Sequence, residues 1–375
     1  MKKKKILFVI TYLELGGAQK QLLSIMKSLP KDEFEVFLAA GEKGFLKKDF
    51  LSVGGVSVFL IPELVRTVNP LLDILAFFKL YFYMKKNNFD IMHTHSPKAS
   101  ILARLAAYLA GVKNIIYTVH GWPFHKYMNI FSYYLYLFLE KVFANITSKI
   151  IVVSKADLDI GIKNRIACAN KFQLIYYGVD IDQFENIFSQ RISMIPKENL
   201  IITVSALKKQ KGLDYFLQAA QIISKKHADA KFLIIGDGPK RSAIELKINN
   251  FGLQDRVVLK GWVDDLTEFY LKTKLMVVSS LWEGLPVAII EAVLSGVAVV
   301  ATDTGGVRDI IKDNRSGVIV DRADINSLAK ASLDVLDNFK AWQDKIAANR
   351  NSIVFSEWSS EKMINQLHGL YSSFS

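Results

Sequence analysis

Cysteine is almost absent from this sequence of 375 residues, which contains Cys168 alone. A single thiol excludes an internal disulfide framework and a zinc site built from several cysteines, and it suits a reducing compartment. Long apolar runs are also lacking, because no stretch reaches the roughly eighteen uninterrupted apolar residues of a membrane-spanning helix. The two best candidates are interrupted by Asp73 and Lys79 and by Glu291. We therefore expect a protein without a membrane span.

Acidic residues are outnumbered, with 36 Asp and Glu against 48 Lys and Arg and a formal charge of +12. This excess predicts attraction to an anionic partner such as nucleic acid, a phosphorylated ligand or acidic lipid. The first lysines and the apolar residues 6–13 could imitate a secretion signal, but Glu14 and Gly16-Gly17 follow without a small-residue cleavage site. We interpret this segment as a first β-strand that runs into a loop.

Short apolar segments alternate with longer amphipathic ones. Strands are predicted at residues 5–10, 35–40, 56–61, 91–95, 114–120 and 149–154, and helices near 19–29, 71–86, 98–110 and 133–144. A second series of strands is predicted at residues 199–207, 230–238, 256–262, 274–280 and 297–303. Apolar strands that alternate with helices are typical of parallel sheets covered on both faces. We therefore expect an α/β protein with two Rossmann-like domains that face a central cleft.

The join between the domains is expected near residues 180–199, which lack a clean helix or strand pattern. The predicted boundaries are 1–185 for the N-terminal domain, 186–355 for the C-terminal domain and 356–375 for a final amphipathic helix. We expect this last helix to return to the N-terminal domain.

Glycine pairs and histidines follow the predicted N-terminal strands, where ligands collect in parallel sheets. Gly16 and Gly17 would let a phosphate approach the start of a helix, although such a pair also makes ordinary turns. The full G-x-G-x-x-G pattern of dinucleotide-binding proteins is missing, which argues against a nicotinamide enzyme. Four histidines cluster after two strands without a carboxylate or cysteine at metal-ligand spacing, so His120 is expected to bind a polar ligand while the others cap strands or pack.

Lysines and glycines follow the predicted C-terminal strands. Lys211, next to Gly212 at a helix start, is expected to contact phosphate, although a lysine cluster is more often a solvated charge run. Gly236 and Gly238 form a turn signal that is expected in the same cleft.

Two glutamates bracket an otherwise apolar segment, WEGLPVAIIEA. Pro286 suits the first turn of a helix, which places Glu283 in the preceding loop and Glu291 inside the helix. The free N–H groups of residues 285–287 would form an anion site, and the carboxylates would accept hydrogen bonds from sugar hydroxyls. The alternative is structural: Glu283 as a helix-capping acid and Glu291 as a paired core charge.

These features together resemble the retaining glycosyltransferases of family four, the group 1 transferases, which have the GT-B fold of two Rossmann-like domains. Glu283 and Glu291, with seven residues between them, match the E-x7-E motif. The resemblance also includes, in order, the Gly16-Gly17 loop, HTHSPKAS, TVHGWPF, YYGVD, LKKQKGLDYF, IIGDGP, LKGWVDD and ATDTGGVRDII.

The resemblance implies a role for each matched residue. Glu291 would hold the ribose of a nucleotide-sugar, UDP-sugar being favoured, Glu283 would hold the donor sugar, and Lys211 would neutralise the diphosphate. His120 would contact the donor sugar near the reacting carbon. The remaining donor-binding residues would be Gly16, Gly17, Gly236, Gly238, Val263, Gly284, Leu285, Pro286 and Val287, and the acceptor side would include His93, His95 and Trp122. Catalysis is thus assigned to His120, Glu283 and Lys211.

One position departs from the family pattern. Ala206 stands where the family usually has an arginine, so one cation on the diphosphate is missing unless Lys208, Lys209 or Arg241 compensates. The implied mechanism is same-face attack in which the departing phosphate accepts the acceptor proton, without a metal or other cofactor. The strings at 157–159 and 180–182 imitate an Asp-x-Asp metal motif, and we interpret both as structural.

The acceptor is the least defined partner. Residues 71–86 and 125–149 mix aromatic and aliphatic residues with lysines, which suits the surface of an anionic leaflet, although ordinary core helices would also fit. We expect a cytoplasmic enzyme, peripheral on the inner face of the cell membrane, that glycosylates a lipid-linked or saccharide acceptor in cell-surface polysaccharide synthesis. The alternatives are a nucleotide-sugar epimerase or hydrolase of the same fold and a catalytically inactive partner subunit. Nucleic acid is not an expected partner, because no recognition module appears.

Overall fold

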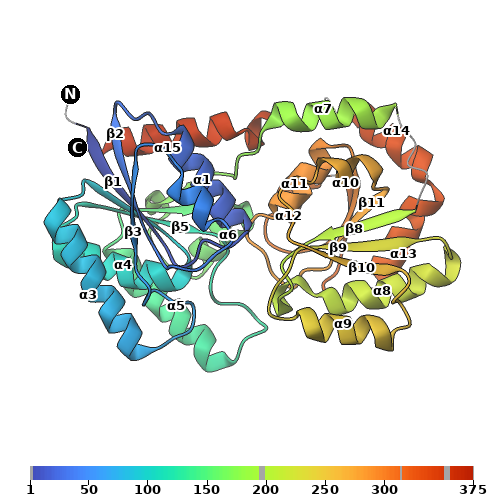
Figure 1. The fold of residues 1–375 in the computed structure, drawn as a ribbon, viewed down its shortest axis with the longest axis horizontal. Helices are drawn as coiled ribbons and strands as arrows, with labels where there is room; N and C mark the ends of the chain where they lie inside the picture. Colours follow the sequence, from blue (N-terminus) through green and yellow to red (C-terminus); the bar gives the residue numbers. More distant parts are fainter. Residues whose placement is uncertain (1–2, 194–198, 313–314, 350–354, 375) are drawn as a thin grey trace. The chain divides into compact units, whose positions relative to one another are not determined.

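The computed structural model describes residues 3–193, 199–312, 315–349 and 355–374. It divides into two compact units, Met1–Gly178 with Ser360–Ser375, and Val179–Ser359. Each unit is a parallel sheet with helices on both faces (Figure 1), which confirms the predicted fold class. The first segment of the N-terminal unit ends at Gly178, seven residues before the predicted boundary at 185.

The first unit has a seven-stranded sheet in the order β3-β2-β1-β4-β5-β6-β7. Its strands are β1 (Lys4–Ile10), β2 (Phe34–Ala40), β3 (Val56–Leu60), β4 (Ile91–His95), β5 (Asn114–Val119), β6 (Lys149–Val152) and β7 (Phe172–Leu174). Its helices are α1 (Gly17–Ser28), α2 (Lys47–Leu51), α3 (Pro70–Asn87), α4 (Pro97–Ala110), α5 (Ile130–Asn145), α6 (Lys155–Lys163) and α15 (Ser360–Ser373), with a 3-10 turn at Ala169–Lys171. The strand order reverses between β1 and β4, where Phe8 pairs with His93.

Local signals explain where these elements begin. The last five residues of β1 are buried, which is why an unbroken apolar segment forms a central strand. The side chain of Asn69 accepts a hydrogen bond from Leu72 N and Pro70 occupies the first turn, so α3 begins there. Asn129 caps α5 in the same way by accepting from Ser132 N. The segment predicted as a first strand is β1.

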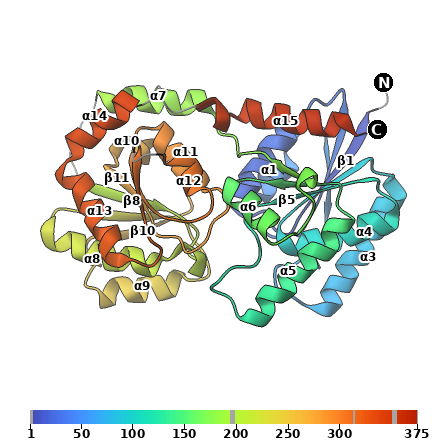
Figure 2. The ribbon, with the colours of Figure 1, turned by 180° about the vertical axis from the view of Figure 1, so that it is seen from behind.

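The second unit has a six-stranded sheet in the order β10-β9-β8-β11-β12-β13. Its strands are β8 (Leu200–Val204), β9 (Lys231–Ile235), β10 (Val257–Gly261), β11 (Leu275–Val278), β12 (Ala298–Thr302) and β13 (Gly317–Val320). Its helices are α7 (Ile181–Ile192), α8 (Leu213–Lys226), α9 (Arg241–Asn250), α10 (Thr267–Lys272), α11 (Val287–Leu294), α12 (Val307–Ile310), α13 (Ile325–Asp337) and α14 (Phe339–Asn349), with 3-10 turns at Lys209–Lys211 and Phe355–Trp358. Helices cover both faces of the sheet when it is seen from behind (Figure 2).

The prediction that residues 180–199 lack a regular element is wrong for their first part, which forms α7. Asp180 caps this helix by accepting from Gln183 N, and Phe184, Ile187 and Arg191 are its buried residues. The apolar pattern is hidden because Arg191 occupies a core position, where its guanidinium donates to the carbonyls of residues 270, 271 and 296. Since α7 packs on α10 and α11, it belongs to the second unit.

The C-terminal helix α15 belongs to the first unit. Met363, Leu367, Leu370 and Tyr371 are its buried residues, and the helix contacts α1. Lys4 Nζ on β1 donates to Ser372 O over 2.9 Å, so the end of the chain is tied to the first strand.

Candidate functional site

The centre of the candidate site is an ion pair between two loops of the second unit. Lys211 follows β8 and Glu283 follows β11, and these neighbouring strands flank the point where the strand order reverses. Loops at such a reversal form the ligand-binding edge of a parallel sheet. Lys211 Nζ lies 2.6 Å from Glu283 Oε1, with the two side chains 21% and 8% exposed. The structure thus brings together two residues that are 72 positions apart in the sequence.

Two further side chains fix the Glu283 carboxylate. Ser280 Oγ donates to Glu283 Oε1 over 2.6 Å. Gln210 Nε2 donates to Trp282 O over 2.8 Å and lies 3.4 Å from Glu283 Oε2. The carboxylate therefore does not cap α11, whose N-cap position is Pro286. The helix-capping alternative is wrong, and Ser280 and Gln210 are site residues that sequence reasoning missed.

Two glycines allow these loops to approach each other. Gly212 has φ +57°, and a Cβ there would lie 2.1 Å from Ser279 O. Gly305 has φ +48°, and a Cβ there would lie 2.3 Å from Glu283 O. Gly306 N also donates to Gly284 O over 2.6 Å. Only glycine fits such left-handed positions against a neighbouring backbone, so both residues are required by the geometry of the site.

Glu291 lies on α11 and is bonded from α10. Tyr270 Oη donates to Glu291 Oε2 over 2.8 Å, and the tyrosine is fully buried. Burial, followed by the nearby Glu291 charge, raises the pKa of Tyr270 well above its usual value. Glu291 is half-buried rather than enclosed in the core. Gly284, Leu285, Pro286 and Val287 lead from Glu283 into the start of this helix. Tyr270 was missed because nothing in the sequence links it to a residue 21 positions later.

The glycine turn after β9 supports the lysine loop. Gly236 has φ +135°, and a Cβ there would lie 2.2 Å from Ser205 O, while one at Gly238 would press on the Leu207 backbone. Leu207 N donates to Asp237 O over 3.0 Å. The turn therefore packs against the loop that leads to Lys211, as predicted for neighbours at one sheet edge.

Arg241 and Val263 were also predicted to take part in the donor site, and no hydrogen bond joins either of them to Lys211, Glu283 or Glu291 among the described residues. Arg241, which could replace the missing arginine at Ala206, is engaged by Asp237 at 3.1 Å and Glu245 at 2.9 Å. Val263 lies in the loop after β10 and is half-buried.

In the first unit, Gly16 is the N-cap residue of α1 and Gly17 its first residue, and residues 11–15 connect them to the end of β1 beside the sheet reversal. Gln19 Nε2 donates to Tyr12 O over 3.1 Å and secures this turn. The helix start carries no acidic residue in its first turn. This arrangement matches the local structure expected for the glycine pair, and its ligand remains a prediction.

His93, His95 and Trp122, which were expected on the acceptor side, are all buried in the first unit, and their contact with an acceptor stays a prediction. The His93 ring nitrogens lie 2.7 Å from Tyr371 Oη and 2.7 Å from Thr118 Oγ1. Trp122 Nε1 donates to Asp157 O over 2.7 Å. Sequence position at strand ends suggested exposure, but these side chains point into the fold.

His120 is held by protein on both sides of its ring. Its Nε2 lies 2.9 Å from His95 Nδ1, and its Nδ1 is hydrogen-bonded to Tyr177 Oη. Burial lowers the pKa of His120 to about 3. Burial, followed by electrostatic repulsion from the His120 ring, lowers the pKa of His93 to about 3. Burial also lowers the pKa of His95 well below its usual value. These imidazoles are neutral at physiological pH.

One aspartate of each Asp-x-Asp string supports the start of a helix. Asp157 bonds with Ser154 at the start of α6, and Asp180 caps α7. Among the described residues, no group of three or more His, Cys, Asp or Glu side chains is arranged to hold a metal ion.

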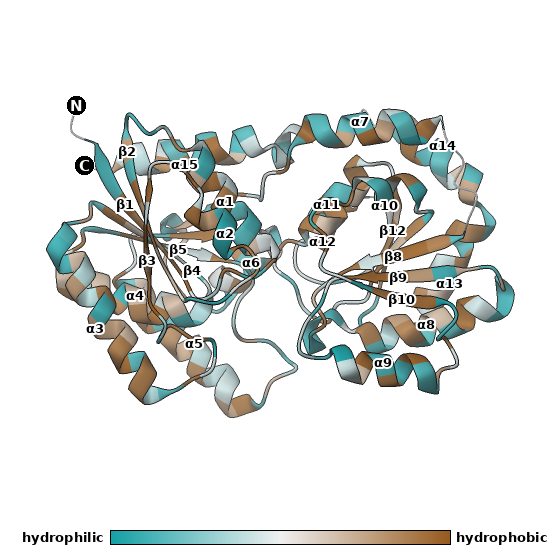
Figure 3. Ribbon diagram, in the orientation of Figure 1, coloured by the Kyte–Doolittle hydropathy of each residue, from teal (hydrophilic) through white to brown (hydrophobic). Residues whose placement is uncertain are grey.

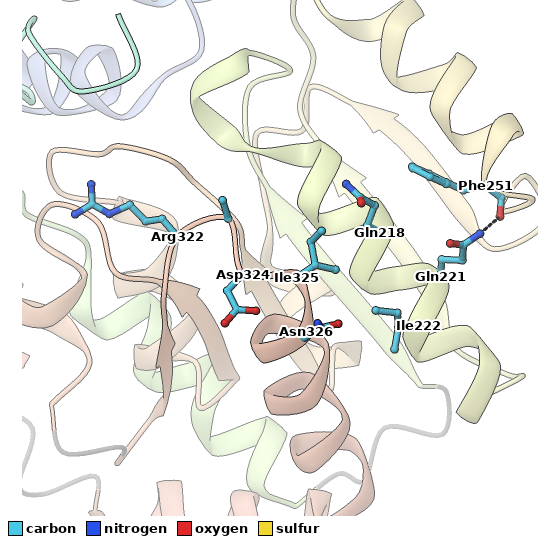
Figure 4. A pocket seen from close by; sticks show the side chains of 9 residues that line it. Gln218, Gln221, Ile222, Phe251, Arg322, Asp324, Ile325 and Asn326 are labelled. Atoms are coloured by element: carbon cyan, nitrogen blue, oxygen red, sulfur yellow. Dashed lines mark hydrogen bonds between the residues drawn. The ribbon is translucent and has the colours of Figure 1, made fainter.

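A separate hollow of about 590 Å³ lies in the second unit, beside α8 and the start of α13 (Figure 4). Its polar side chains serve local structure, since Gln221 Nε2 donates to Phe251 O and Asp324 caps α13. None of the site residues described above lines it.

Comparison with known proteins follows the same division of the chain. The family description "Glycosyltransferase Family 4" matches residues 15–183, and "Glycosyl transferases group 1" matches residues 185–351. An Escherichia coli UDP-Gal:alpha-D-GlcNAc-diphosphoundecaprenol alpha-1,3-galactosyltransferase is 31% identical over 98% of this chain and 97% of its own length. The Staphylococcus aureus capsular polysaccharide biosynthesis glycosyltransferase CapM is 25% identical over 94% of this chain and 96% of its own.

Solved structures support the fold. Anabaena HepE in complex with UDP-glucose has a TM-score of 0.80 at 21% identity, covering 98% of this chain and 99% of its own. The two parallel sheets thus have the GT-B architecture. With the family descriptions and the full-length relative, this chain belongs to the group 1 glycosyl transferases, glycosyltransferase family 4.

Proposed function

We propose that this protein transfers a sugar from a UDP-sugar to a lipid-linked sugar acceptor, with retention at the anomeric carbon, in the synthesis of a cell-surface polysaccharide. The Lys211–Glu283 pair at the reversal of the sheet, followed by Glu291 on α11, carries this proposal. The E. coli galactosyltransferase, which is similar over nearly the full length and uses UDP-Gal and a GlcNAc-diphosphoundecaprenol acceptor, supports the donor and acceptor classes.

The proposed donor site uses a cation and two carboxylates. The diphosphate oxygens would bind Lys211 Nζ, which contacts Glu283 in the structure. Glu283 would keep its bond from Ser280 and offer its other oxygen to sugar hydroxyls. Glu291 would accept from the ribose while Tyr270 holds its second oxygen. A charge-assisted contact of this kind stabilises a leaving diphosphate without a metal.

The proposed step breaks the bond between the anomeric carbon and the β-phosphate oxygen, and forms a bond from that carbon to the acceptor oxygen on the same face. The acceptor proton passes to the departing phosphate, and UDP leaves. His120 is poorly suited to act as the base, because both of its ring nitrogens are bonded and its pKa is lowered to about 3. This supports proton transfer to the phosphate itself.

We also propose that the first unit rests on an anionic membrane surface through α3, α4 and α5, since the acceptor is lipid-linked. Neighbouring helices α3, α4 and α5 carry many apolar residues (Figure 3), and several of these side chains are exposed. These are Leu71, Ile74, Leu75, Phe78, Phe82, Leu105, Tyr108, Leu109, Ile130, Phe131, Tyr134, Leu135, Phe138 and Val142. Monomeric proteins rarely expose so continuous an apolar surface without a partner.

Helix α5 gives the best support for a lipid partner. Ile130 and Phe131 are 74% and 75% exposed, whereas Glu140 and Ala144 are the buried residues of this helix. Such inverted burial leaves an aromatic and aliphatic face outward, and Lys126 and Lys141 are exposed beside it. Aromatic residues flanked by lysines suit the interface of an anionic leaflet. No described helix is long and apolar enough to cross a membrane.

The first experiment measures UDP binding and turnover with a panel of UDP- and other nucleotide-sugars, with and without a GlcNAc-diphosphate-lipid acceptor. Lys211→Met and Glu291→Leu should each abolish or strongly weaken UDP binding, while Lys225→Met, which removes an exposed lysine from the C-terminal end of α8, should not. Turnover that survives EDTA supports a metal-independent reaction. Donor cleavage that ignores every acceptor would instead support a hydrolase, and absence of UDP binding by folded protein would support the inactive-subunit alternative.

Membrane contact is tested by vesicle flotation with neutral and anionic vesicles. Phe131→Ser with Phe138→Ser should reduce binding to anionic vesicles, because each buried phenylalanine contributes about 1.5–3 kcal/mol. Leu246→Ser is the matched control, since it removes an exposed apolar side chain from α9 in the second unit. Equal flotation of the wild type, the double phenylalanine variant and Leu246→Ser would contradict the assignment of this surface to membrane contact.

A further inference from the structure

Three side chains form a hydrogen-bonded series at the ends of the first sheet. His95 is the last residue of β4, and His120 directly follows β5. Tyr177 lies one residue before Gly178, where the chain leaves the first unit. His95 Nδ1 lies 2.9 Å from His120 Nε2, and His120 Nδ1 is bonded to Tyr177 Oη. The rings are stacked in the same order, with centroid distances of 5.1 Å for His95–His120 and 5.7 Å for His120–Tyr177.

This series leaves the His120 ring no rotational freedom. Both nitrogens have a protein partner, so a ring flip would break two hydrogen bonds at once. His95 and Tyr177 are themselves 1% and 6% exposed, so neither can leave its place. Gly121 follows with φ +99°, which lets the chain turn sharply directly after the histidine.

The bonding also couples the tautomer of His120 to that of His95 and to the direction of the Tyr177 hydroxyl. Because each ring nitrogen faces one partner, one nitrogen must donate and the other accept, and the choice is shared along the series. His95 Nε2 has no hydrogen-bond partner among the described residues, so the series ends there. A histidine held in this way presents a fixed surface to a ligand instead of a titrating group.

We propose that Tyr177 is a positioning residue for the transfer reaction, which holds His120, through the bond to Nδ1, in one orientation and one tautomer, with His95 fixing the opposite nitrogen. The inference rests on the proposed function and on the expectation from the family resemblance that His120 contacts the donor sugar. Tyr177 stands next to the boundary at Gly178–Val179, so it also ties the orientation of His120 to the segment that connects the units.

The alternative is that Tyr177 only packs in the fold and does not orient His120. A second buried tyrosine of the same unit, Tyr371, provides a control that distinguishes these two roles. Tyr371 is also buried and also bonds a histidine, with Oη 2.7 Å from His93 Nδ1. The His93 ring is 4.4 Å from that of His95 by centroids but its nitrogens bond Tyr371 and Thr118. Tyr371→Phe therefore removes the same hydroxyl from the same kind of bond without touching His120.

The test compares Tyr177→Phe with Tyr371→Phe in steady-state kinetics and in nitrogen-15 NMR of the histidine rings. Tyr177→Phe should lower kcat roughly 10- to 100-fold with little change in donor KM, because a small misplacement of a reacting geometry has effects of this size. The His120 signals should change from one tautomer to a mixture. Tyr371→Phe should leave kcat and the His120 tautomer as in the wild type.

A second pair of variants, at His95, tests the same inference if Tyr177→Phe does not fold. His95→Asn keeps a polar atom near the position of Nδ1 and should retain most of kcat, whereas His95→Leu should behave like Tyr177→Phe. Unchanged kcat and an unchanged His120 tautomer in Tyr177→Phe would overturn the inference while the transferase function stands. If the wild type transfers no sugar, the proposed function fails, and the NMR comparison still decides whether Tyr177 fixes His120.

Discussion

The ion pair between Arg104 on α4 and Glu140 on α5 allows a sharp stability prediction. Arg104 Nη2 lies 2.9 Å from Glu140 Oε2, and the side chains are 0% and 2% exposed. Arg104 Nε lies 3.3 Å from Ser100 O, and the guanidinium lies 4.4 Å from the centroid of the Tyr117 ring. Glu140→Leu would remove the counter-charge and leave the guanidinium enclosed.

The size of the effect follows from the desolvated charge. Removing one partner of a buried pair destabilises a protein by about 3–5 kcal/mol, because the remaining charge is unpaired. Domains of this size lose about 2–4 °C in Tm per kcal/mol, so Glu140→Leu should lower the Tm by roughly 6–20 °C. Arg104→Met combined with Glu140→Leu should recover part of this loss, since it removes the unpaired charge. It should stay about 1–3 kcal/mol below the wild type, because the buried Tyr117 hydroxyl, 3.4 Å from Glu140 Oε1, loses its acceptor.

Urea unfolding followed by circular dichroism measures the free energy of unfolding of the four proteins in this cycle. A loss below about 1 kcal/mol for Glu140→Leu, or a double variant less stable than either single one, would refute the reasoning. Since Glu140 and Ala144 are the buried residues of α5, Glu140→Leu should also loosen this helix and weaken flotation with anionic vesicles. Glu140→Gln is the intermediate case, because the amide keeps a hydrogen bond without the charge.

Three further predictions concern the donor loops and the core histidine. Tyr270→Phe removes the hydroxyl bonded to Glu291 and should weaken UDP binding by about 1 kcal/mol, roughly five-fold, in calorimetry, with the fold intact. Gly212→Ala should cost about 1–3 kcal/mol of unfolding free energy from its left-handed φ alone, before the clash with Ser279 O, and an unchanged urea midpoint would contradict this. The pKa of His93 is about 3 when folded and about 6.5 when unfolded, so its contribution to stability is complete above pH 6.5 and is lost as the pH falls towards 3, by about 1.4 kcal/mol per pH unit. His93→Gln should reduce the pH slope of the unfolding free energy by this amount, while the slopes from His95 and His120 remain.

The strands were predictable because buried parallel strands are apolar along their whole length, as in β1 and β8. Short edge strands gave no such signal, and β7 and β13 were missed, with three and four residues each. Helix α7 was missed for the opposite reason, since Arg191 is a core residue in the structure although its type indicates a surface.

Candidate site residues were predictable where a strand end and a turn signal coincide, as at Lys211 and Glu283. Burial was not predictable from residue type: His93 and Trp122 look like ligand contacts in the sequence but satisfy their polar atoms inside the fold. Ser280 and Tyr270 carried no signal, because a serine before a loop and a tyrosine on a neighbouring helix become site residues only through three-dimensional contact.

The position of Ser280 also bears on the missing second cation at Ala206. Lys211 serves two partners, because it neutralises Glu283 before a donor binds and the diphosphate in the proposed reaction. Moving the lysine from one to the other would leave an 8% exposed carboxylate unpaired, which is costly in a desolvated site. The Ser280 hydroxyl at 2.6 Å and the Gln210 amide at 3.4 Å reduce that penalty by continuing to donate to Glu283. A site with one cation therefore depends on these two neutral donors more than a site with two would, and Ser280→Ala should weaken diphosphate binding although Ser280 touches no phosphate.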